Sequence, residues 1–238
     1  MISFFKNKIY VSALFFFVLA VDICVKFSAD PLPARFLTKT ALLSILLYFF
    51  MVNKKEKHVK DKFFYIGFLF FWIGDLVLLL YENPILYIAG MSLFIIGKLF
   101  YTIRFSHQKD FEMSSLMPFF VVIFIYIVVI VLFVYDNLKD FFIPIIIYIF
   151  ASMLLGLFAF LRKDSVNRKS FYLIMIAVII GAGSDSTAVL QSFYDSELPY
   201  HQILVMLFYA LFQYLIILGL VEEKEIKHKD LSTKTASF

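Results

Sequence analysis

Two aspartates inside long apolar segments are the residues of this sequence best suited to do chemistry. They are Asp75 and Asp185, and Lys39 opens another apolar segment. An ionisable side chain costs about 2.5–3.5 kcal/mol at the centre of a membrane, so such residues face the protein interior and are candidates for function. Two carboxyl groups and a lysine could supply a general acid, a general base and an electrostatic anchor. The same residues could instead fasten helices together as ion pairs, and both interpretations stay open.

The depth of these residues in a membrane indicates whether they can meet. Counted at about 1.5 Å per residue from the inner face, Asp75 lies at roughly 20 Å, Asp185 at roughly 22 Å and Lys39 at roughly 24 Å. Tyr148 falls near the same layer. The sequence therefore predicts that these four residues share one level, in the outer half of the membrane.

Three further ionisable residues lie in apolar segments. Asp22 and Lys26 are four residues apart and so lie on one helix face, which predicts an ion pair within that helix. Contact between Lys26 and a ligand is the alternative. Lys98 lies deeper, where its long side chain could reach toward the membrane surface. Its candidate partners are Tyr101, Tyr209 and Gln213.

Other familiar kinds of active site find no support in the sequence. The single cysteine, Cys24, excludes an intrachain disulfide and a cysteine zinc site. The histidines lack metal-ligand spacing, and two carboxylates alone are a weak signal for a metal. GxSxG and HExxH motifs are absent, which gives no support to serine-hydrolase or zincin chemistry. We expect neither a metal nor a cofactor.

The composition of the chain places it in a membrane. Of its 238 residues 62% are hydrophobic and 17% charged, against roughly half and a quarter in soluble domains. We therefore predict an all-α fold, a polytopic bundle of eight transmembrane helices. Pro84 is expected to open the fourth helix after a tight turn. The expected helices lie near residues 9–28, 35–52, 63–81, 84–105, 115–135, 141–161, 170–194 and 200–221.

Basic residues are concentrated on one of the two membrane faces of this arrangement. Seventeen of the 22 Lys and Arg residues fall on the face that carries both termini, two on the other face and three within helices. The positive-inside rule makes the first face cytoplasmic, so both termini are predicted to be cytoplasmic. We expect a multi-pass integral protein, in the plasma or inner membrane of a bacterium, with the lipid bilayer as partner. Nucleic acid is not expected, since the basic loops lack stacking aromatic residues.

The chain is expected to form one domain. Residues 1–221 would make the transmembrane unit and residues 222–238 a polar, frayed cytoplasmic tail. The basic start could be a signal peptide, but its apolar run is long and charged, which favours a retained helix. Gly74, Gly181 and Gly183, beside the aspartates, are expected to let helices pack closely.

Four stretches of the sequence resemble one membrane protein family. In their order along the chain, together with the eight helices, they resemble the YhhN-like family, which includes the mammalian lysoplasmalogenases. Thr40 stands where that family usually has proline, and Lys98 stands where a histidine is common. The matching stretches are Thr38-Lys39, Gly67 to Leu80 with Ile73-Gly74-Asp75, Ala182 to Phe193 with Ser184-Asp185-Ser186, and Leu204 to Gly219 with Tyr209 and Gln213.

The resemblance implies hydrolysis of the vinyl ether bond of a lysoplasmalogen, which gives a fatty aldehyde and a glycerophospho-base. Asp75 and Asp185 would act as the paired carboxyls of a glycosidase do, and the aspartate further from Lys39 is expected to be the acid. The lipid phosphate would meet a lysine at headgroup level. The residues expected to contact this lysophospholipid are Lys39, Tyr148, Tyr209, Gln213, Tyr101 and Lys26.

Two other classes of function stay open. A proton-coupled transporter would also use paired carboxylates within the membrane, although the predicted helices lack the Pro and Gly interruptions of many transporters. A non-catalytic membrane protein that binds a lipid or another protein is the third possibility. The sequence gives no indication of the oligomeric state.

Overall fold

Long apolar helices build the whole computed structural model, which describes residues 2–28, 31–54, 58–106, 113–138, 141–194 and 200–226. Among these residues, eight helices are long and apolar enough to span a membrane. The predicted all-α membrane fold is therefore confirmed, and a short N-terminal helix adds to it. The elements are α1 (Ile2–Lys6), α2 (Lys8–Lys26), α3 (Leu32–Asn53), α4 (Asp61–Val77), the 3-10 helix η1 (Leu78–Leu80), α5 (Pro84–Phe105), α6 (Met113–Leu138), α7 (Phe142–Leu161), α8 (Arg168–Phe193) and α9 (His201–Val221).

Asparagine and proline residues set two of the helix starts. The Asn7 side chain accepts a hydrogen bond of 2.9 Å from the amide of Ile9 and so caps α2. Asn83 accepts one of 2.9 Å from the amide of Ile85, and Pro84 occupies the first position of α5. Both arrangements satisfy or remove amide hydrogens that a helix start leaves without a partner. The tight turn expected before Pro84 is present.

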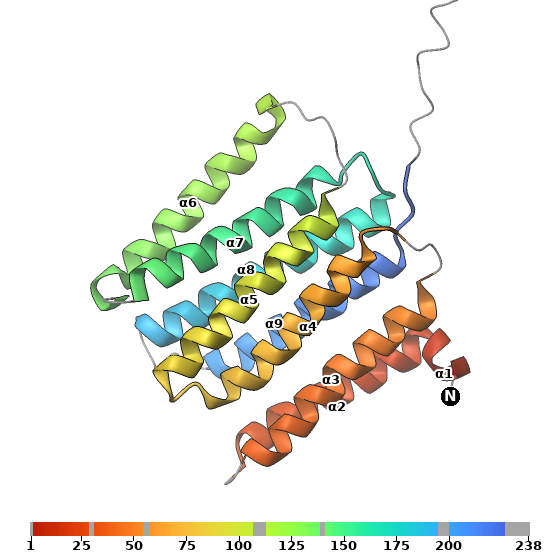
Figure 1. Cartoon of the computed structure of the whole chain (residues 1–238), viewed down its shortest axis with the longest axis horizontal. Coiled ribbons are helices and arrows are strands. Elements are labelled where there is room, and N and C mark those ends of the chain that lie inside the picture. The colour runs from red at the N-terminus through yellow and green to blue at the C-terminus, as the bar shows by residue number, and fades with distance from the viewer. Residues whose placement is uncertain are drawn as a thin grey trace, which may run out of the picture.

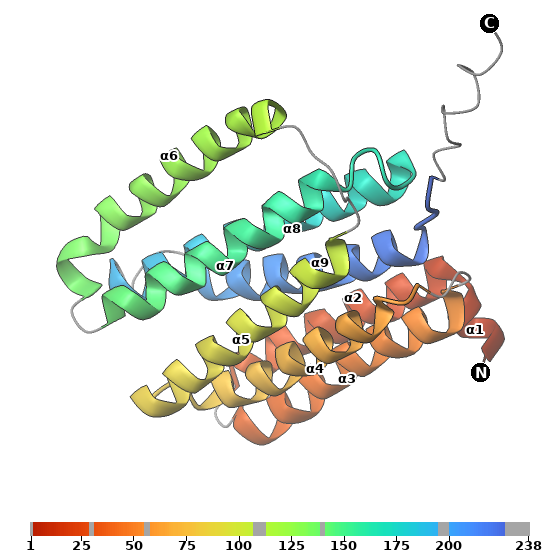
Figure 2. The same cartoon turned by 45° about the horizontal axis from the view of Figure 1, so that its top comes forward.

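The helices run side by side and pack mainly as antiparallel neighbours along the chain. The most extensive contacts join α8 to α9 and α4 to α5. The α2–α3 hairpin lies at one edge of the bundle and α6 at the opposite edge (Figure 1). Turning the molecule shows α6 standing off from the other helices over much of its length (Figure 2). The interior that could hold a site therefore lies among α3, α4, α5, α7, α8 and α9.

Glycines allow these interior helices to approach closely. A β-carbon added to Gly74 would lie 2.7 Å from the Phe94 ring, and one added to Gly181 would lie 2.8 Å from the Phe212 ring. Both positions are therefore packing contacts, as the sequence predicts. Gly183 differs, because the nearest atom to an added β-carbon there would be 3.6 Å away.

The bundle has two ends with different contents. We call the end at which Lys26, Arg35 and Gln202 lie the cavity end, because these residues line a cavity. The opposite end, where Arg104 and Glu223 lie, is the closed end. Both described ends of the chain reach the closed end, since Lys8 forms an ion pair with Glu222. The assignment of this end to the cytoplasm remains a prediction.

The segment after α9 departs from expectation. Residues 222–226 were predicted to begin a frayed tail, but they pack against the bundle. Glu223 is only 6% exposed, and Glu225 forms a β-bridge with Val166. The physical reason is that Glu223 neutralises arginines buried at the closed end. The rest of the predicted tail, residues 227–238, lies outside the described residues.

Candidate functional site

Both aspartates singled out in the sequence line one cavity of about 230 Å³ at the cavity end of the bundle. Asp75 comes from α4 and Asp185 from α8. Their side chains are 6% and 14% exposed. Two acidic groups from distant parts of the chain therefore share one partly open cavity. Four other residues expected at the site also line it, namely Lys26, Lys39, Tyr148 and Tyr209.

Asp75 is held by a lysine and a tyrosine. Lys39 Nζ donates to Asp75 Oδ1 at 3.1 Å, and the Tyr209 hydroxyl is hydrogen-bonded to the same carboxyl group. Gln213 Nε2 donates to the Tyr209 oxygen at 3.2 Å, and the Tyr101 hydroxyl donates to Gln213 Oε1 at 3.0 Å. Because its oxygen accepts from Gln213, Tyr209 is left to direct its own proton at Asp75.

Tyr101 and Gln213 lie behind this centre. They were expected to contact substrate, but the residues that line the cavity do not include them. Tyr101 has no exposed surface and Gln213 is 1% exposed. Their position makes them supports that fix the orientation of Tyr209.

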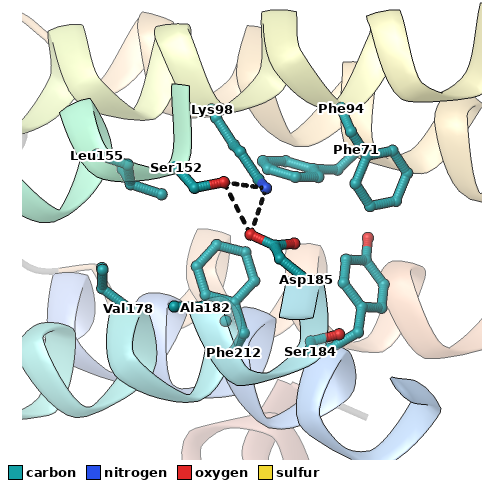
Figure 3. Close-up of a pocket in the computed structure, with 12 residues that line it drawn as sticks. Phe71, Phe94, Lys98, Ser152, Leu155, Val178, Ala182, Ser184, Asp185 and Phe212 are labelled. Atoms are coloured by element: carbon teal, nitrogen blue, oxygen red, sulfur yellow. Dashed lines mark hydrogen bonds and ion pairs between the residues drawn. The ribbon is translucent and has the colours of Figure 1, made fainter. Parts of the chain in front are cut away.

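Asp185 is held by three donors from two other helices. Lys98 Nζ and Ser152 Oγ donate to Asp185 Oδ2 at 2.6 and 2.8 Å, and the Tyr148 hydroxyl donates to Oδ1 at 2.6 Å. Lys98 Nζ also donates to Ser152 Oγ at 2.7 Å. Figure 3 shows the side chains of Lys98, Ser152 and Asp185 converging from α5, α7 and α8. The Lys98 ammonium lies 3.7 Å from the centre of the Tyr148 ring, a cation–π distance.

Lys98 and Ser152 are parts of the site that the sequence did not assign to it. Lys98 was expected nearer the opposite face, with a tyrosine or glutamine as its partner. Side chains of a helix tilt toward its N-terminus, and α5 begins at the cavity end, so the long lysine side chain reaches back to Asp185. Ser152 gave no signal, because small hydroxyl residues are common in membrane helices and usually bond to their own backbone.

The expected ion pair between Asp22 and Lys26 is wrong. Asp22 accepts a hydrogen bond of 2.5 Å from Thr38 Oγ1 and lies 3.7 Å from Arg35 Nε. It is 1% exposed and faces α3 instead of Lys26 on its own helix. A buried carboxylate needs hydrogen-bond or ion-pair partners, and Thr38 and Arg35 on α3 supply them. Lys26 instead lines the cavity.

The cavity combines this polar floor with apolar walls. Leu78, Leu79, Met91 and Phe94 line it beside the carboxyl groups. Within the described part of the chain, no three His, Cys, Asp or Glu side chains are grouped so that they could hold a metal ion. The arrangement can bind an amphipathic molecule and move protons next to it.

A comparison with protein families decides where the chain belongs. The model of the YhhN family matches residues 34–220. The protein is a member of the YhhN family. Comparison with curated proteins and with solved structures gives no match.

The YhhN match covers both polar centres. It includes Lys39, Asp75, Lys98 and Asp185, and it leaves out Lys26. The YhhN family includes lysoplasmalogenases. Lys98 supplies the cation beside Asp185.

Proposed function

We propose that this YhhN protein is a membrane-embedded ether hydrolase that cleaves the vinyl ether bond of an alkenyl lysophospholipid. The observation that carries the proposal is the meeting of Asp75 and Asp185 in one cavity, each held by a lysine and a tyrosine. A structural ion pair would not need a cavity beside it. Membership of a family that includes lysoplasmalogenases supports the choice of substrate.

The chemistry needs one carboxylic acid and one carboxylate. The acid donates a proton to the second carbon of the vinyl ether, and a cation that resembles an oxocarbenium ion forms at the first carbon and its oxygen. The carboxylate stabilises that cation and takes a proton from the attacking water. The hemiacetal then breaks its carbon–oxygen bond to glycerol: the glycerol oxygen takes the proton that the carboxylate removed from water, the hemiacetal hydroxyl gives its proton back to the first carboxyl group, and a fatty aldehyde leaves. One water is consumed and both carboxyl groups return to their starting states.

The hydrogen bonds favour one division of these roles. Asp185 accepts from Lys98, Ser152 and Tyr148, so both of its oxygens are engaged as acceptors, which is how a carboxylate is held. Asp75 has one hydrogen bond from lysine and its contact with Tyr209. We therefore assign Asp185 as the carboxylate and Asp75 as the acid. The criterion applied to the sequence, distance from Lys39, would instead make Asp185 the acid, because Lys39 pairs with Asp75. We set that criterion aside because Asp185 has a lysine of its own, Lys98, at 2.6 Å.

The walls of the cavity suit a lipid with a single chain. The apolar wall formed by Leu78, Leu79, Met91 and Phe94 runs beside the polar floor. An alkenyl chain placed along this wall would bring its first two carbons, the reacting ones, between the carboxyl groups. Burial of each methylene contributes about 0.8 kcal/mol relative to water, so the chain supplies binding energy while the floor supplies the chemistry.

Lipid mass spectrometry tests the proposal directly. The purified protein in detergent is incubated with an alkenyl lysophospholipid, and with acyl and saturated alkyl analogues as controls for bond type. We expect the alkenyl lipid alone to yield a fatty aldehyde and a glycerophospho-base, and no product from Asp75→Asn or Asp185→Asn. Unchanged alkenyl lipid with the folded wild-type protein, or full activity in either variant, would remove the assignment.

The two roles can be separated by chemical rescue. Replacement of an aspartate by alanine leaves space for a small carboxylate. We expect added formate to restore aldehyde formation to Asp185→Ala, because an external anion can replace the carboxylate. Restoration of Asp75→Ala instead would exchange the two roles.

The transporter alternative makes a different demand on the helices. Transporters of several folds bind their substrates at interrupted helices near the middle of the membrane. In the described residues, α8 runs unbroken past Asp185, from Arg168 to Phe193. The α4 helix ends at Val77, two residues after Asp75, and continues as the 3-10 helix η1 up to Leu80. Uptake of a lipid into vesicles without bond cleavage would favour the transporter class.

A further inference from the structure

We propose that Arg35 and Lys26 form a phosphate-binding subsite at the mouth of the cavity, which holds the headgroup phosphate of a single-chain phospholipid. The inference deepens the proposed function, on which its choice of a lipid ligand rests. Both residues line the cavity together with Asp75 and Asp185. They come from the end of α2 and the start of α3, at the cavity end of the bundle.

Arg35 is buried without adequate partners of its own. The residue is 9% exposed, and its Nε has no hydrogen-bond partner within the described residues. Its contacts are an ion pair of 3.7 Å with Asp22 and a long contact of 3.9 Å from Nη2 to the sulfur of Met206. A buried guanidinium normally makes several short hydrogen bonds, often in pairs to one carboxylate or phosphate. Because Arg35 also lines the cavity, an oxyanion of a bound ligand can supply the missing hydrogen-bond partner.

Lys26 differs from the two lysines beside the aspartates. Lys39 and Lys98 each donate to a carboxylate, at 3.1 and 2.6 Å. Among the described residues no carboxylate lies within ion-pair distance of the Lys26 ammonium, although it also lines the cavity. A second cation is thus available beside Arg35.

The charges of this cluster do not balance. It contains four cations, Lys26, Arg35, Lys39 and Lys98, and three acidic groups, Asp22, Asp75 and Asp185. With Asp75 as the protonated acid of the proposed mechanism, two carboxylates remain, so positive charge is in excess. A phosphodiester carries one negative charge at neutral pH, so a lipid phosphate lowers this excess, and an uncharged lipid does not.

The spacing along α3 matches the ligand. Arg35 and Lys39 are four residues apart, so they lie on one helix face with β-carbons about 5–6 Å apart. In an alkenyl lysophospholipid, the vinyl ether and the phosphate are attached to the two outer carbons of glycerol, a span of similar size. A phosphate on Arg35 therefore sets the vinyl ether beside Lys39 and Asp75. The subsite would choose which bond of the lipid reaches the carboxyl groups.

Binding measurements test this subsite without relying on turnover. The probes are a saturated alkyl lysophosphatidylethanolamine, which has no vinyl ether to cleave, the matching alkylglycerol, which lacks phosphate, and soluble glycerophosphate, which lacks the chain. Apparent affinities come from the shift of thermal unfolding with ligand concentration in detergent. We expect wild type to bind the lysophospholipid at least about tenfold more tightly than the other two, the size of one or two charge-assisted hydrogen bonds.

Variants identify the residues responsible. Lys26→Gln breaks no ion pair and is expected to weaken the lysophospholipid about tenfold while leaving alkylglycerol affinity unchanged. Arg35→Gln should do the same, and Arg35→Lys should retain part of the preference because it keeps a charge beside Asp22. Lys163→Gln is the matched control, since Lys163 is exposed and follows α7 at the closed end.

The outcomes separate this inference from the proposed function. Equal affinities for lysophospholipid and alkylglycerol, or unchanged phosphate preference in both Lys26→Gln and Arg35→Gln, would overturn the subsite even if vinyl ether hydrolysis is found. Glycerophosphate bound as tightly as the lipid would overturn the lipid part of the assignment. Conversely, a phosphate preference that depends on Arg35, in a protein that cleaves no vinyl ether, would support the subsite and remove the hydrolase.

Discussion

The two ends of this bundle both bury charged residues, but they do so differently. At the cavity end, Asp75, Asp185 and Lys39 line a cavity of about 230 Å³. At the closed end, Arg104 and Arg162 have no exposed surface and are enclosed by side chains. A buried charge in a membrane protein is therefore not by itself a sign of function. The cavity distinguishes a site from a structural ion pair, because buried guanidinium nitrogens without a hydrogen-bond partner occur among the described residues at both ends, in Arg35 and in Arg162.

The closed end is a network centred on Glu223. Its carboxylate accepts from Arg162 Nη2 and from Lys54 Nζ, both at 2.9 Å, and it forms an ion pair with Arg104. Arg104 also donates from Nε to Asp61 at 2.9 Å. Burial lowers the pKa of Arg162 to about 10, with Glu223 acting in the opposite direction. The arginine therefore stays charged at neutral pH, and its charge depends on Glu223 for compensation.

The largest effect is expected from the aspartates at the cavity end. Asp75→Asn and Asp185→Asn should lower kcat for an alkenyl lysophospholipid by about 10²–10⁴-fold, the usual contribution of general acid–base groups. The thermal stability of Asp75→Asn should fall less than that of a closed-end variant, because Lys39 lines the cavity and water there can solvate it. Aldehyde release and the melting temperature, measured on the same preparations, check both halves of this expectation.

The next effect belongs to the closed end and concerns stability. Glu223→Gln leaves two buried arginines without their shared anion, so the free energy of unfolding should fall by about 3–5 kcal/mol. Activity per folded molecule should stay unchanged, because Glu223 lies at the opposite end from the cavity. Glu225→Gln is the control. The Glu225 side chain is 47% exposed where it pairs with His58, and an exposed ion pair contributes about 0–1 kcal/mol to stability. A lost activity with unchanged stability in Glu223→Gln would erase the contrast between the ends.

Two neighbouring glycines of α8 should respond differently to the same substitution. Gly181→Ala places a β-carbon 2.8 Å from the Phe212 ring, so it should destabilise the protein by about 1–3 kcal/mol through overpacking. Gly183→Ala has room beside Phe208, so it should not destabilise the protein. Alanine favours a helix over glycine by about 1 kcal/mol, so a small gain in stability is expected. Unfolding of both variants in detergent tests whether α8 is held as tightly as the structure indicates. Equal losses of stability would contradict that packing.

The smallest effect sharpens the description of the Asp185 centre. Tyr148→Phe removes one of three hydrogen bonds to Asp185, which is worth about 0.5–1.5 kcal/mol. We expect kcat to fall about threefold to tenfold, with little change in KM. Tyr126→Phe is the matched control, because the Tyr126 hydroxyl bonds to Ser186 and not to Asp185. A larger loss from Tyr126→Phe would mean that the orientation of α6 controls the site.

The sequence predicted the helices well for a simple physical reason. A helix that spans a membrane needs a long apolar run, and charged residues in such a run are costly, so both are visible in the sequence. The same pattern identified Asp75 and Asp185 as candidates. The interaction partners of these buried residues could not be predicted from the sequence, because they depend on how each helix is rotated against its neighbours. Lys98 and Asp185 are 87 residues apart, and no local pattern joins them. Asp22 shows the same limit, since i,i+4 spacing favoured Lys26 but burial against α3 selected Thr38.

The position of Glu223 in the chain also has a consequence for biosynthesis. The two arginines that it neutralises precede it by 119 and 61 residues. As the ribosome delivers the helices in order, Arg104 and Arg162 reach the membrane long before their common anion does. Arg104 already has Asp61 as a partner, but Arg162 has to wait for Glu223 for compensation of its charge. Closure of this end therefore depends on the insertion of α9 and the segment after it, and a nascent chain stopped before Glu223 should stay open at this end.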